Sequence, residues 1–593
     1  HLSIRRQRQM CIRDRNRREF IKALMIGYMY NLIVPSNARS TDAFINYSLP
    51  KTGDIRLLHI TDTHAQLEPI YFREPSVNLG VGSNKNMPPH LVSENLLNYY
   101  SINNNYLKYA FTPLNFSEFA SQYGKLGGYA YLKTVVDNLR NEADGKALLL
   151  DGGDTWQGSG LSLFTNGEDM VESSNILGVD VMTGHWEFTY GQSQFIKNIK
   201  KFKGEFVAHN ISLTEEAQFD GEEAYDDFGH FQKPYTIKKI SNHRIAIIGQ
   251  AFPYTPIANP GRFVNNLTFG IRENELQELV NRINQNDKPD IIVLLSHNGV
   301  DVDKKLASRV KGIDIILGGH THDVIPKPIE VINERHRTII INSGCSGKFL
   351  SVLDLDIHSK NSFDYRYNLL PIFSNKIQPS GNMTRFIEKK TKPFESTLNE
   401  VIGYSNHELY RRGTFTGSFD SLLCKSLNSV MGSEISLSPG FRWGTSLPKN
   451  TDIKMSDIYN QTAITYPNTY RRELNGSTLK NILEDVADNI FNPDPYMQQG
   501  GDMVRTAGLL YDITPKNIIG KRISNLKLSN GNIIEPNKNY VISGWASVNQ
   551  IETGKPIWEI TREYLQNNKI YSSQDNEKPR ILGESDNLGT TSS

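Results

Sequence analysis

Short apolar runs recur along the first two thirds of the chain, and five of them end in an aspartate or a histidine. These five runs occupy residues 54–60, 147–150, 178–182, 290–295 and 313–317. Runs of this length are typical of buried strands, whereas residues 127–140 and 273–284 have the apolar spacing of helices. Strands that alternate with helices predict an α/β domain, with its chemistry just past the carboxyl ends of the strands.

The pattern changes after a charged helical segment at residues 383–398. Helices are predicted at 419–431 and 478–489, and a strand at 539–543, so we expect a second, mixed α+β domain. The long Asn- and Pro-rich stretch 68–124 is interpreted as irregular. The predicted organisation is a leader (1–40), an α/β metal domain (53–375), a linker helix (376–400), the second domain (401–570) and a disordered tail (571–593).

The leader has its own composition. The order Asn16-Arg17-Arg18-Glu19-Phe20-Ile21-Lys22 precedes a modest apolar run (23–34) and small residues at 36–38. This order is similar to a twin-arginine export signal, with a basic amphipathic helix as the alternative. We therefore expect a periplasmic protein that is exported folded. Residues 1–15 also resemble translated upstream sequence, so whether they belong to the natural protein stays open.

Composition removes several classes of function. A chain of 593 residues exceeds one hydrophobic core, and 38% apolar residues is ordinary for a globular protein. The net charge of +1, without a basic stripe, does not favour nucleic acid as a partner. No apolar run is long enough to span a membrane. Beyond the leader, Cys345 and Cys424 are interpreted as unpaired buried thiols, with a disulfide as the alternative.

The five strand ends together predict a pair of metal ions. Their polar residues are Asp62, His64, Asp154, His185, His297, His320 and His322. Residues i and i+2 of a strand point to the same side, so each close pair in this set can face one site. A binuclear site needs about this many ligands. Imidazole with carboxylate suits manganese, iron or zinc better than magnesium or calcium. A single histidine after a strand is usually only a satisfied polar residue, and the joint pattern carries the prediction.

These motifs resemble the metallophosphoesterases of the 5′-nucleotidase family. The resemblance rests on Asp62-x-His64, Gly153-Asp154, Gly184-His185-x-Glu187-Phe188, Ser296-His297 and Gly318-Gly319-His320-x-His322, and it extends over about residues 54–560. It implies a four-layer α/β/β/α domain followed by a 5′-nucleotidase-type C-terminal domain. It also implies that Asp154 bridges two ions, that Asp62, His64 and His322 hold one ion, and that His185, His297 and His320 hold the other.

The chain departs from that family at one motif. Nucleotidases have Gly-Asn-His-Glu where this chain has Gly184-His185-Trp186-Glu187, so Trp186 replaces the histidine that assists phosphoryl transfer. The altered motif is similar to the thiosulfohydrolase branch of the family, as are residues 71–78, 249–256, 438–444 and 492–505. This resemblance implies hydrolytic release of sulfate from a cysteine S-thiosulfonate on the Sox carrier protein of bacterial thiosulfate oxidation. Manganese is the expected metal, and a monomer the expected state.

Substrate residues are implied by the same resemblance. A water or hydroxide between the ions would attack, because coordination lowers its pKa. Arg442 and Arg412 match substrate-contacting arginines, whose guanidinium groups suit oxyanions. The alternative is an ion pair between domains. Tyr466 and Trp545 match the aromatics that sandwich a base in nucleotidases, with core packing as the alternative for Trp545. Weaker candidates are Arg411, Lys348 and Arg505.

Two other functions compete with this interpretation. The first is a periplasmic 5′-nucleotidase or another phosphoesterase, which Trp186 does not favour. The second is a non-catalytic binding protein, which the complete set of seven candidate ligands does not favour. A nucleotide panel separates the first from a thiosulfohydrolase, and metal analysis tests the second.

Overall fold

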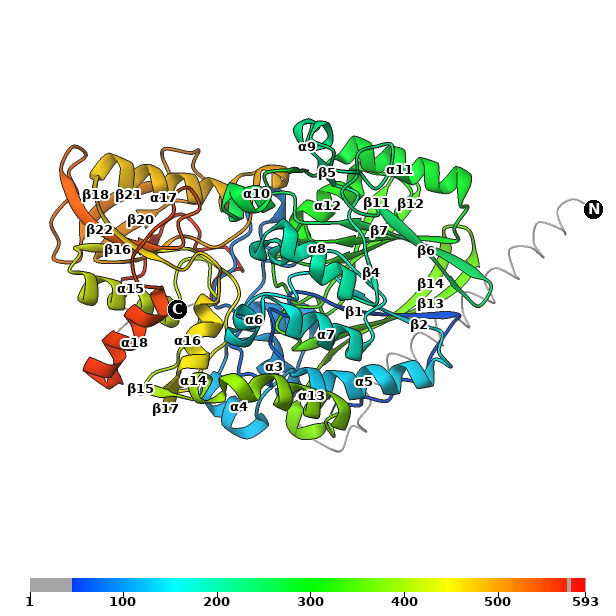
Figure 1. Cartoon of the computed structure of the whole chain (residues 1–593), viewed down its shortest axis with the longest axis horizontal. Coiled ribbons are helices and arrows are strands. Elements are labelled where there is room, and N and C mark those ends of the chain that lie inside the picture. Colours follow the sequence, from blue (N-terminus) through cyan, green and yellow to red (C-terminus); the bar gives the residue numbers. More distant parts are fainter. Residues whose placement is uncertain (1–44, 573–576, 592–593) are drawn as a thin grey trace, which may run out of the picture. The chain divides into compact units, whose positions relative to one another are not determined.

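The structure is a computed structural model that describes residues 45–572 and 577–591 (Figure 1). One compact unit comprises residues 46–102 and 107 onward, and it contains the candidate metal ligands as well as the second domain. The proposed leader and its export signal lie outside the described residues. Within the described residues, no helix combines the length and the apolar character needed to cross a membrane.

Two six-stranded sheets form the centre of the first half. The first sheet has the order β14 (Ser362–Pro371), β13 (Phe349–Ser359), β1 (Ile55–Ile60), β2 (Ala147–Asp151), β3 (Val181–Met182), β4 (Glu205–Phe206). The second has the order β11 (Ile329–Asn333), β12 (His336–Asn342), β10 (Ile315–Gly318), β9 (Ile291–Ser296), β7 (His243–Gln250), β6 (Tyr235–Ile240). Strands β1, β2 and β3 are parallel, as are β7, β9, β10 and β12.

The two sheets pack face to face. One apolar cluster combines Ile55 and Leu57 of β1 with Val293 of β9 and Leu317 of β10, all fully buried. The central strands β1, β2, β9 and β10 are buried along their whole length, because helices cover the outer faces of the sheets. Helix α5 (Tyr129–Glu142) packs against β2, and α11 (Glu273–Asn286) and α12 (Val300–Arg309) cover the second sheet. The predicted four-layer α/β/β/α domain is therefore confirmed.

Short elements complete this half. They are α6 (Gly160–Thr165), α7 (Glu168–Leu177), α8 (Gln192–Lys201), β5 (Ile211–Leu213), α9 (Glu215–Phe219), α10 (Thr255–Ala258) and β8 (Leu267–Phe269). His209 and Asn210 lie between β4 and β5, where their side chains bond to Gln250 and to the carbonyl of Ala251. These two polar side chains therefore have partners outside the set of candidate ligands.

The second half contains a four-stranded mixed sheet. Its order is β18 (Thr469–Asn475), β22 (Asn539–Trp545), β16 (Ile435–Ser438), β19 (Arg505–Ala507). Two smaller sheets are β17 (Thr451–Lys454), β15 (Val401–Ser405), β23 (Ile570–Tyr571) and β21 (Ile523–Leu528), β20 (Leu509–Ile513), β24 (Arg580–Ile581). The helices are α15 (Ser418–Met431), α16 (Met455–Thr462), α17 (Gly476–Phe491) and α18 (Ile557–Asn568).

Three sequence expectations need correction. The stretch 68–124 is not irregular, because it contains α2 (Ser93–Tyr100), α3 (Asn105–Phe111) and α4 (Phe116–Tyr123). Helix α2 buries Leu96, Leu97 and Tyr100, an apolar face that its many asparagines and tyrosines disguise. The linker is two helices, α13 (Gly381–Thr391) and α14 (Glu395–Leu398), because Pro393 cannot continue the first one.

The third correction concerns the tail. The prediction of disorder after residue 570 is wrong for residues 577–591. Strand β24 pairs with β20, and the buried Asn587 side chain donates to the carbonyl of Gly80. The polar composition of the tail concealed this packing, because its partners are distant in the sequence, 68 residues away at Asp512 of β20 and 507 residues away at Gly80.

Candidate metal centre

All seven candidate ligands lie just past the carboxyl ends of strands. Asp62 and His64 follow β1, Asp154 follows β2 and His185 follows β3. His297 follows β9, and His320 and His322 follow β10. Because the first three strands and the last two belong to two sheets packed on each other, their ends converge at one edge of the domain. Every member of the set is at most 7% exposed.

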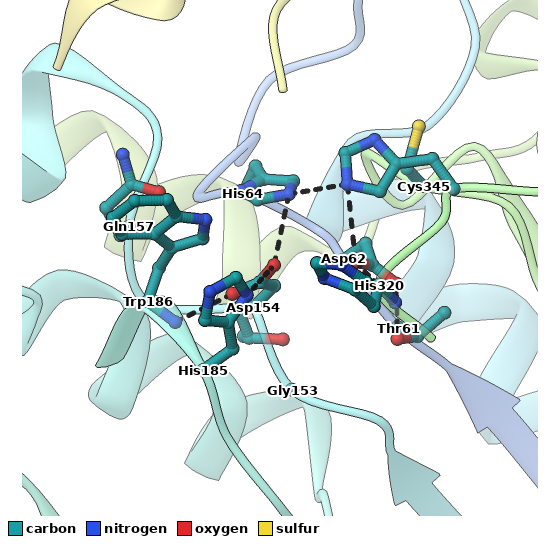
Figure 2. A network of polar contacts seen from close by, with 12 residues as sticks. Thr61, Asp62, His64, Gly153, Asp154, Gln157, His185, Trp186, His320 and Cys345 are labelled. Carbon is teal, nitrogen blue, oxygen red and sulfur yellow. Dashed lines mark hydrogen bonds and ion pairs between the residues drawn. The ribbon is translucent and has the colours of Figure 1, made fainter. Parts of the chain in front are cut away.

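The seven residues form two groups that share Asp154 (Figure 2). One group is Asp154, His185, His297 and His320, and the other is Asp62, His64, Asp154 and His322. Within each group, one possible ligand atom per residue lies within 4.8 Å of the others. The structure thus brings together the set predicted from the sequence, divided as the family resemblance implies. The two groups fit a pair of metal ions.

The nitrogen atoms of the imidazoles support that fit. His64 Nε2 lies 2.9 Å from His322 Nε2, so two nitrogens that both suit a cation face each other. His185 Nε2 and both ring nitrogens of His320 are buried and lack a hydrogen-bond partner among the described residues. Buried polar atoms without partners are costly, and a bound cation satisfies them.

Burial and the nearby carboxylates set the charge states of the histidines in this site. Burial lowers the pKa of His64 to about 4 and also lowers the pKa of His322, so both are neutral imidazoles near pH 7. Burial acts in the same direction on His297, but the carboxylates of Asp154 and Asp62 outweigh it and raise that pKa to about 10. A cation between these carboxylates would replace the proton that balances their charge.

Hydrogen bonds from neighbouring groups orient the site. His297 Nδ1 donates to the carbonyl of Gly152 at 2.7 Å, which leaves Nε2 facing Asp154 at 3.1 Å. The buried carboxylate of Glu187 accepts the backbone N–H groups of His185 and Thr155, each at 2.7 Å. It therefore ties the loop after β3 to the loop after β2. The sequence showed Glu187 within a motif, but its partners become visible only in the structure.

A cavity of about 370 Å³ opens beside the two groups. Its wall combines Trp186, at the start of the 3-10 turn Trp186–Tyr190, with Phe441 and Trp443 from the second half. The ring centroid of Trp443 lies 4.0 Å from that of Phe441 and 5.1 Å from that of Trp186. The Trp186 backbone N–H donates to Asp154 at 2.8 Å, which places the indole beside the candidate metal ligands (Figure 2). Both halves of the compact unit build the site.

The predicted substrate residues are distributed unequally. Arg442 lines this cavity and also a smaller one of about 60 Å³, whereas Arg412 lines only the smaller one. Tyr466 lines the larger cavity and donates its hydroxyl to the carbonyl of Ala258 at 2.5 Å. Trp545 is absent from the lining and donates to Ser438 at 2.8 Å, an arrangement that agrees with the alternative of core packing.

The weaker basic candidates are all in buried ion pairs. Arg411 pairs with Asp420, Arg505 with Asp502, and Lys348 with Glu74. None of the three arginine or lysine side chains lines the larger cavity. Cys345 and Cys424 are both free and buried, which confirms the interpretation of these residues as unpaired thiols.

The comparisons with known proteins agree with this architecture. Residues 55–324 match the calcineurin-like phosphoesterase model, and residues 401–549 match the C-terminal domain of 5′-nucleotidases. The structure is similar to that of sulfate thiohydrolase SoxB from Thermus thermophilus in complex with glycerol. The two share 32% identity over 90% of this chain and 98% of that chain, with a TM-score of 0.83. The chain belongs to the SoxB family.

Other relatives of this SoxB-family chain carry phosphoesterase names. A 5′-nucleotidase precursor, also from Thermus thermophilus, shares the fold, with a TM-score of 0.69 and 20% identity over 89% of this chain and 99% of that one. The trifunctional nucleotide phosphoesterase YfkN of Bacillus subtilis is 26% identical over 439 residues, 67% of this chain. The chain spans 29% of YfkN and about half of the snake venom 5′-nucleotidase of Gloydius brevicauda. Family and site together identify a metal-dependent hydrolase.

Proposed function

We propose that this protein hydrolyses a cysteine S-thiosulfonate on a Sox carrier protein and releases sulfate. Membership of the SoxB family supports this reaction. The residues in the wall of the larger cavity favour a sulfohydrolase over a phosphoesterase. That wall places Trp186, Phe441 and Trp443 beside the candidate ligands. All histidines that line this cavity among the described residues are candidate metal ligands, so none is left to assist a poor leaving group.

The proposed reaction suits such a site. A water oxygen forms a bond to the terminal sulfone sulfur, and the bond between that sulfur and the neighbouring sulfur breaks. The electron pair of that bond leaves with the persulfide, so one water and one thiosulfonate give persulfide, sulfate and two protons, with no change in electron count. A persulfide anion is a far better leaving group than a nucleoside alkoxide. The indole of Trp186 can therefore stand where a phosphoesterase needs an acid.

The residues of the chain have separate roles in this proposal. Asp154, shared by both groups, and the other six candidate ligands would hold two divalent ions, manganese being the expected metal. When bound, such ions supply Lewis-acid polarisation and lower the pKa of water. Arg442, which lines the same cavity, would bind the sulfonate oxygens. The aromatic wall would exclude bulk water, which strengthens these interactions.

A substrate panel tests the proposal. Purified, metal-loaded protein is incubated with a synthetic peptide that carries a cysteine S-thiosulfonate, and separately with nucleoside monophosphates. We expect sulfate from the peptide and at most trace phosphate from the nucleotides. Asp154→Asn, which removes the carboxylate common to both groups, is the inactive control. Rapid nucleotide hydrolysis without sulfate release would establish the phosphoesterase alternative.

We also propose that the chain acts in the periplasm after twin-arginine export. The supporting observation is the order Arg17-Arg18-Glu19-Phe20-Ile21-Lys22. Replacing both arginines with lysine should retain the protein in the cytoplasm of a host with this pathway. Cell fractionation measures the distribution, and an unchanged periplasmic yield would contradict the proposal.

A further inference from the structure

The segment that follows α17 reaches the metal centre. An added Cβ at Gly500, which has a φ of +82°, would lie 2.1 Å from His320 Nε2, so only glycine fits this approach. The carbonyl of the next residue, Gly501, accepts a hydrogen bond from Arg442 Nη2 at 2.8 Å. The backbone N–H of Asp502 donates to the carbonyl of Gly440 at 2.8 Å. The segment therefore runs directly along the turn that carries Arg442.

Asp502 is a buried carboxylate at the centre of three arginines. Its side chain is 6% exposed. The distances from its oxygens are 2.9 Å to Arg505 Nη2, 3.4 Å to Arg442 Nε and 3.6 Å to Arg412 Nη1. Burial would raise the pKa of Asp502, but the three guanidinium groups outweigh it and lower that pKa. Asp502 is therefore ionised at neutral pH.

The position of this negative charge needs an explanation. Asp502 lines the same cavity as Arg442, where a carboxylate repels any anionic substrate. What offsets this repulsion is the position that Asp502 gives to Arg442. Asp502 holds Nε of Arg442 and Gly501 holds Nη2, while Nη1 is buried without a partner among the described residues. The planar guanidinium is thus held at Nε and at Nη2, and its Nη1 group is available to a ligand.

We infer that Asp502 is a positioning residue, which holds Arg442 in the orientation that binds an oxyanion. Without the carboxylate, the long side chain of Arg442 would regain rotamer freedom, and the two neighbouring guanidinium groups would repel each other. The inference rests on the proposed function only for the identity of the natural oxyanion. Inorganic sulfate, the proposed product, is a suitable probe because its binding can be measured without turnover.

The decisive test is sulfate affinity of metal-loaded Asp502→Asn, measured by isothermal titration calorimetry. The substitution retains the shape of the side chain and removes one negative charge from the site. A carboxylate that acts only through its charge would weaken sulfate binding, so its removal would tighten binding or leave it unchanged. A positioning carboxylate predicts the opposite, a loss of about ten-fold. Tighter or unchanged binding would overturn the inference.

Matched variants control for folding. Asp488→Asn breaks another ion pair, with Arg522 at 2.6 Å; neither of these two residues lines either cavity, so sulfate affinity should be unchanged. Asp502→Glu restores the carboxylate and should bind sulfate within about three-fold of wild type. Should Asp502→Asn not accumulate, affinity for Asp502→Glu as weak as that of Arg442→Ala would overturn the inference. Metal content and the thermal midpoint are recorded for each variant.

A double-mutant comparison shows whether Asp502 acts through Arg442. In an Arg442→Ala background, Asp502→Asn should cost much less affinity than in wild type, because the group it positions is absent. Equal losses in both backgrounds would contradict the inference. With the thiosulfonated peptide, Asp502→Asn should raise KM more than it lowers kcat. If wild type binds sulfate but releases none from the peptide, the proposed function fails while the positioning role stands.

Discussion

A left-handed backbone conformation recurs among the candidate ligands. Asp62, His64, Asp154, His320 and His322 all have positive φ, between 46° and 74°. Residues other than glycine and asparagine rarely adopt this backbone conformation, and such strain concentrates at functional sites. The sequence predicted which residues meet, because each follows a strand. It did not reveal the left-handed turns that aim them at one another, since these depend on the contacts between loops.

Glu187 provides a prediction at the scale of one residue. Glu187→Gln replaces one carboxylate oxygen with an NH₂ group, which cannot accept a hydrogen bond, so one of the two N–H groups of His185 and Thr155 loses its partner. The loops should loosen, and metal affinity should fall by about ten-fold or more. Competition with a chelator measures this affinity. Glu172→Gln, which breaks only a surface ion pair with Lys390, is the control. Wild-type affinity in Glu187→Gln would refute the positioning role.

Trp186 provides the second prediction at this scale. If the persulfide leaves without an acid, Trp186→His should not raise the rate of sulfate release. The loss of a buried indole from the contacts with Phe441 and Trp443 should lower stability by about 3 kcal/mol. Steady-state assays and thermal unfolding measure the two effects. A large gain in sulfohydrolase rate would show that the site needs an acid after all.

At the scale of elements, the long central strands were predictable from the sequence, whereas the helices of residues 68–124 and the packing of the tail were not. Strands β1, β2, β9 and β10 are long enough and apolar enough to read directly from the sequence. The two-residue strands β3 and β4 are set by pairing with neighbours that sequence does not show. The same limitation hid the helices of 68–124 and the packing of the tail. Only long-range contacts define these elements.

An ion pair between the edges of the two sheets provides a pH-dependent prediction. Glu205 of β4 accepts hydrogen bonds from Lys233 and from Lys238 of β6. Burial raises the pKa of Glu205, but these lysines outweigh it and lower the pKa to about 2. Since the pKa is depressed on folding, the stabilisation is complete above about pH 4.5, the ordinary value for glutamate, and is lost as the pH falls towards 2.

Glu205→Gln should therefore destabilise the protein by about 1 kcal/mol at pH 7, a small value because the group is one-third exposed. The difference between wild type and variant should narrow below pH 4.5. Urea unfolding at pH 7 and at pH 4 measures both quantities. A difference that widens in acid would contradict the assignment of these partners.

At the scale of the whole molecule, the site requires both halves of the chain. The candidate metal ligands come from residues 62–322, whereas Phe441, Arg442 and Trp443 follow β16. The family resemblance predicted that arginines from the second half reach the site. The apolar wall could not be predicted, because it arises from a contact between residues more than 200 positions apart, Trp186 and Trp443. The role of Asp502 could not be predicted either, because Arg442 and Arg412 approach it only through the fold of the second half.

Metal removal tests the assembled centre. Ions that bind only the folded state stabilise it, by roughly 3 kcal/mol per site at a free concentration 100 times the dissociation constant. A chelator should lower the thermal midpoint and abolish sulfate release, and manganese should restore both. Retention of full activity after removal of all metal would contradict the assignment of the centre.

The most direct measurement of the central claim is the fate of solvent oxygen. The metal-loaded protein is incubated with the thiosulfonated peptide in ¹⁸O-water, and mass spectrometry follows both products. We predict one sulfate for each persulfide, with a single ¹⁸O atom in each sulfate, because water attacks the sulfone sulfur. Sulfate without the label, or an unchanged peptide beside rapid nucleotide hydrolysis, would contradict the account.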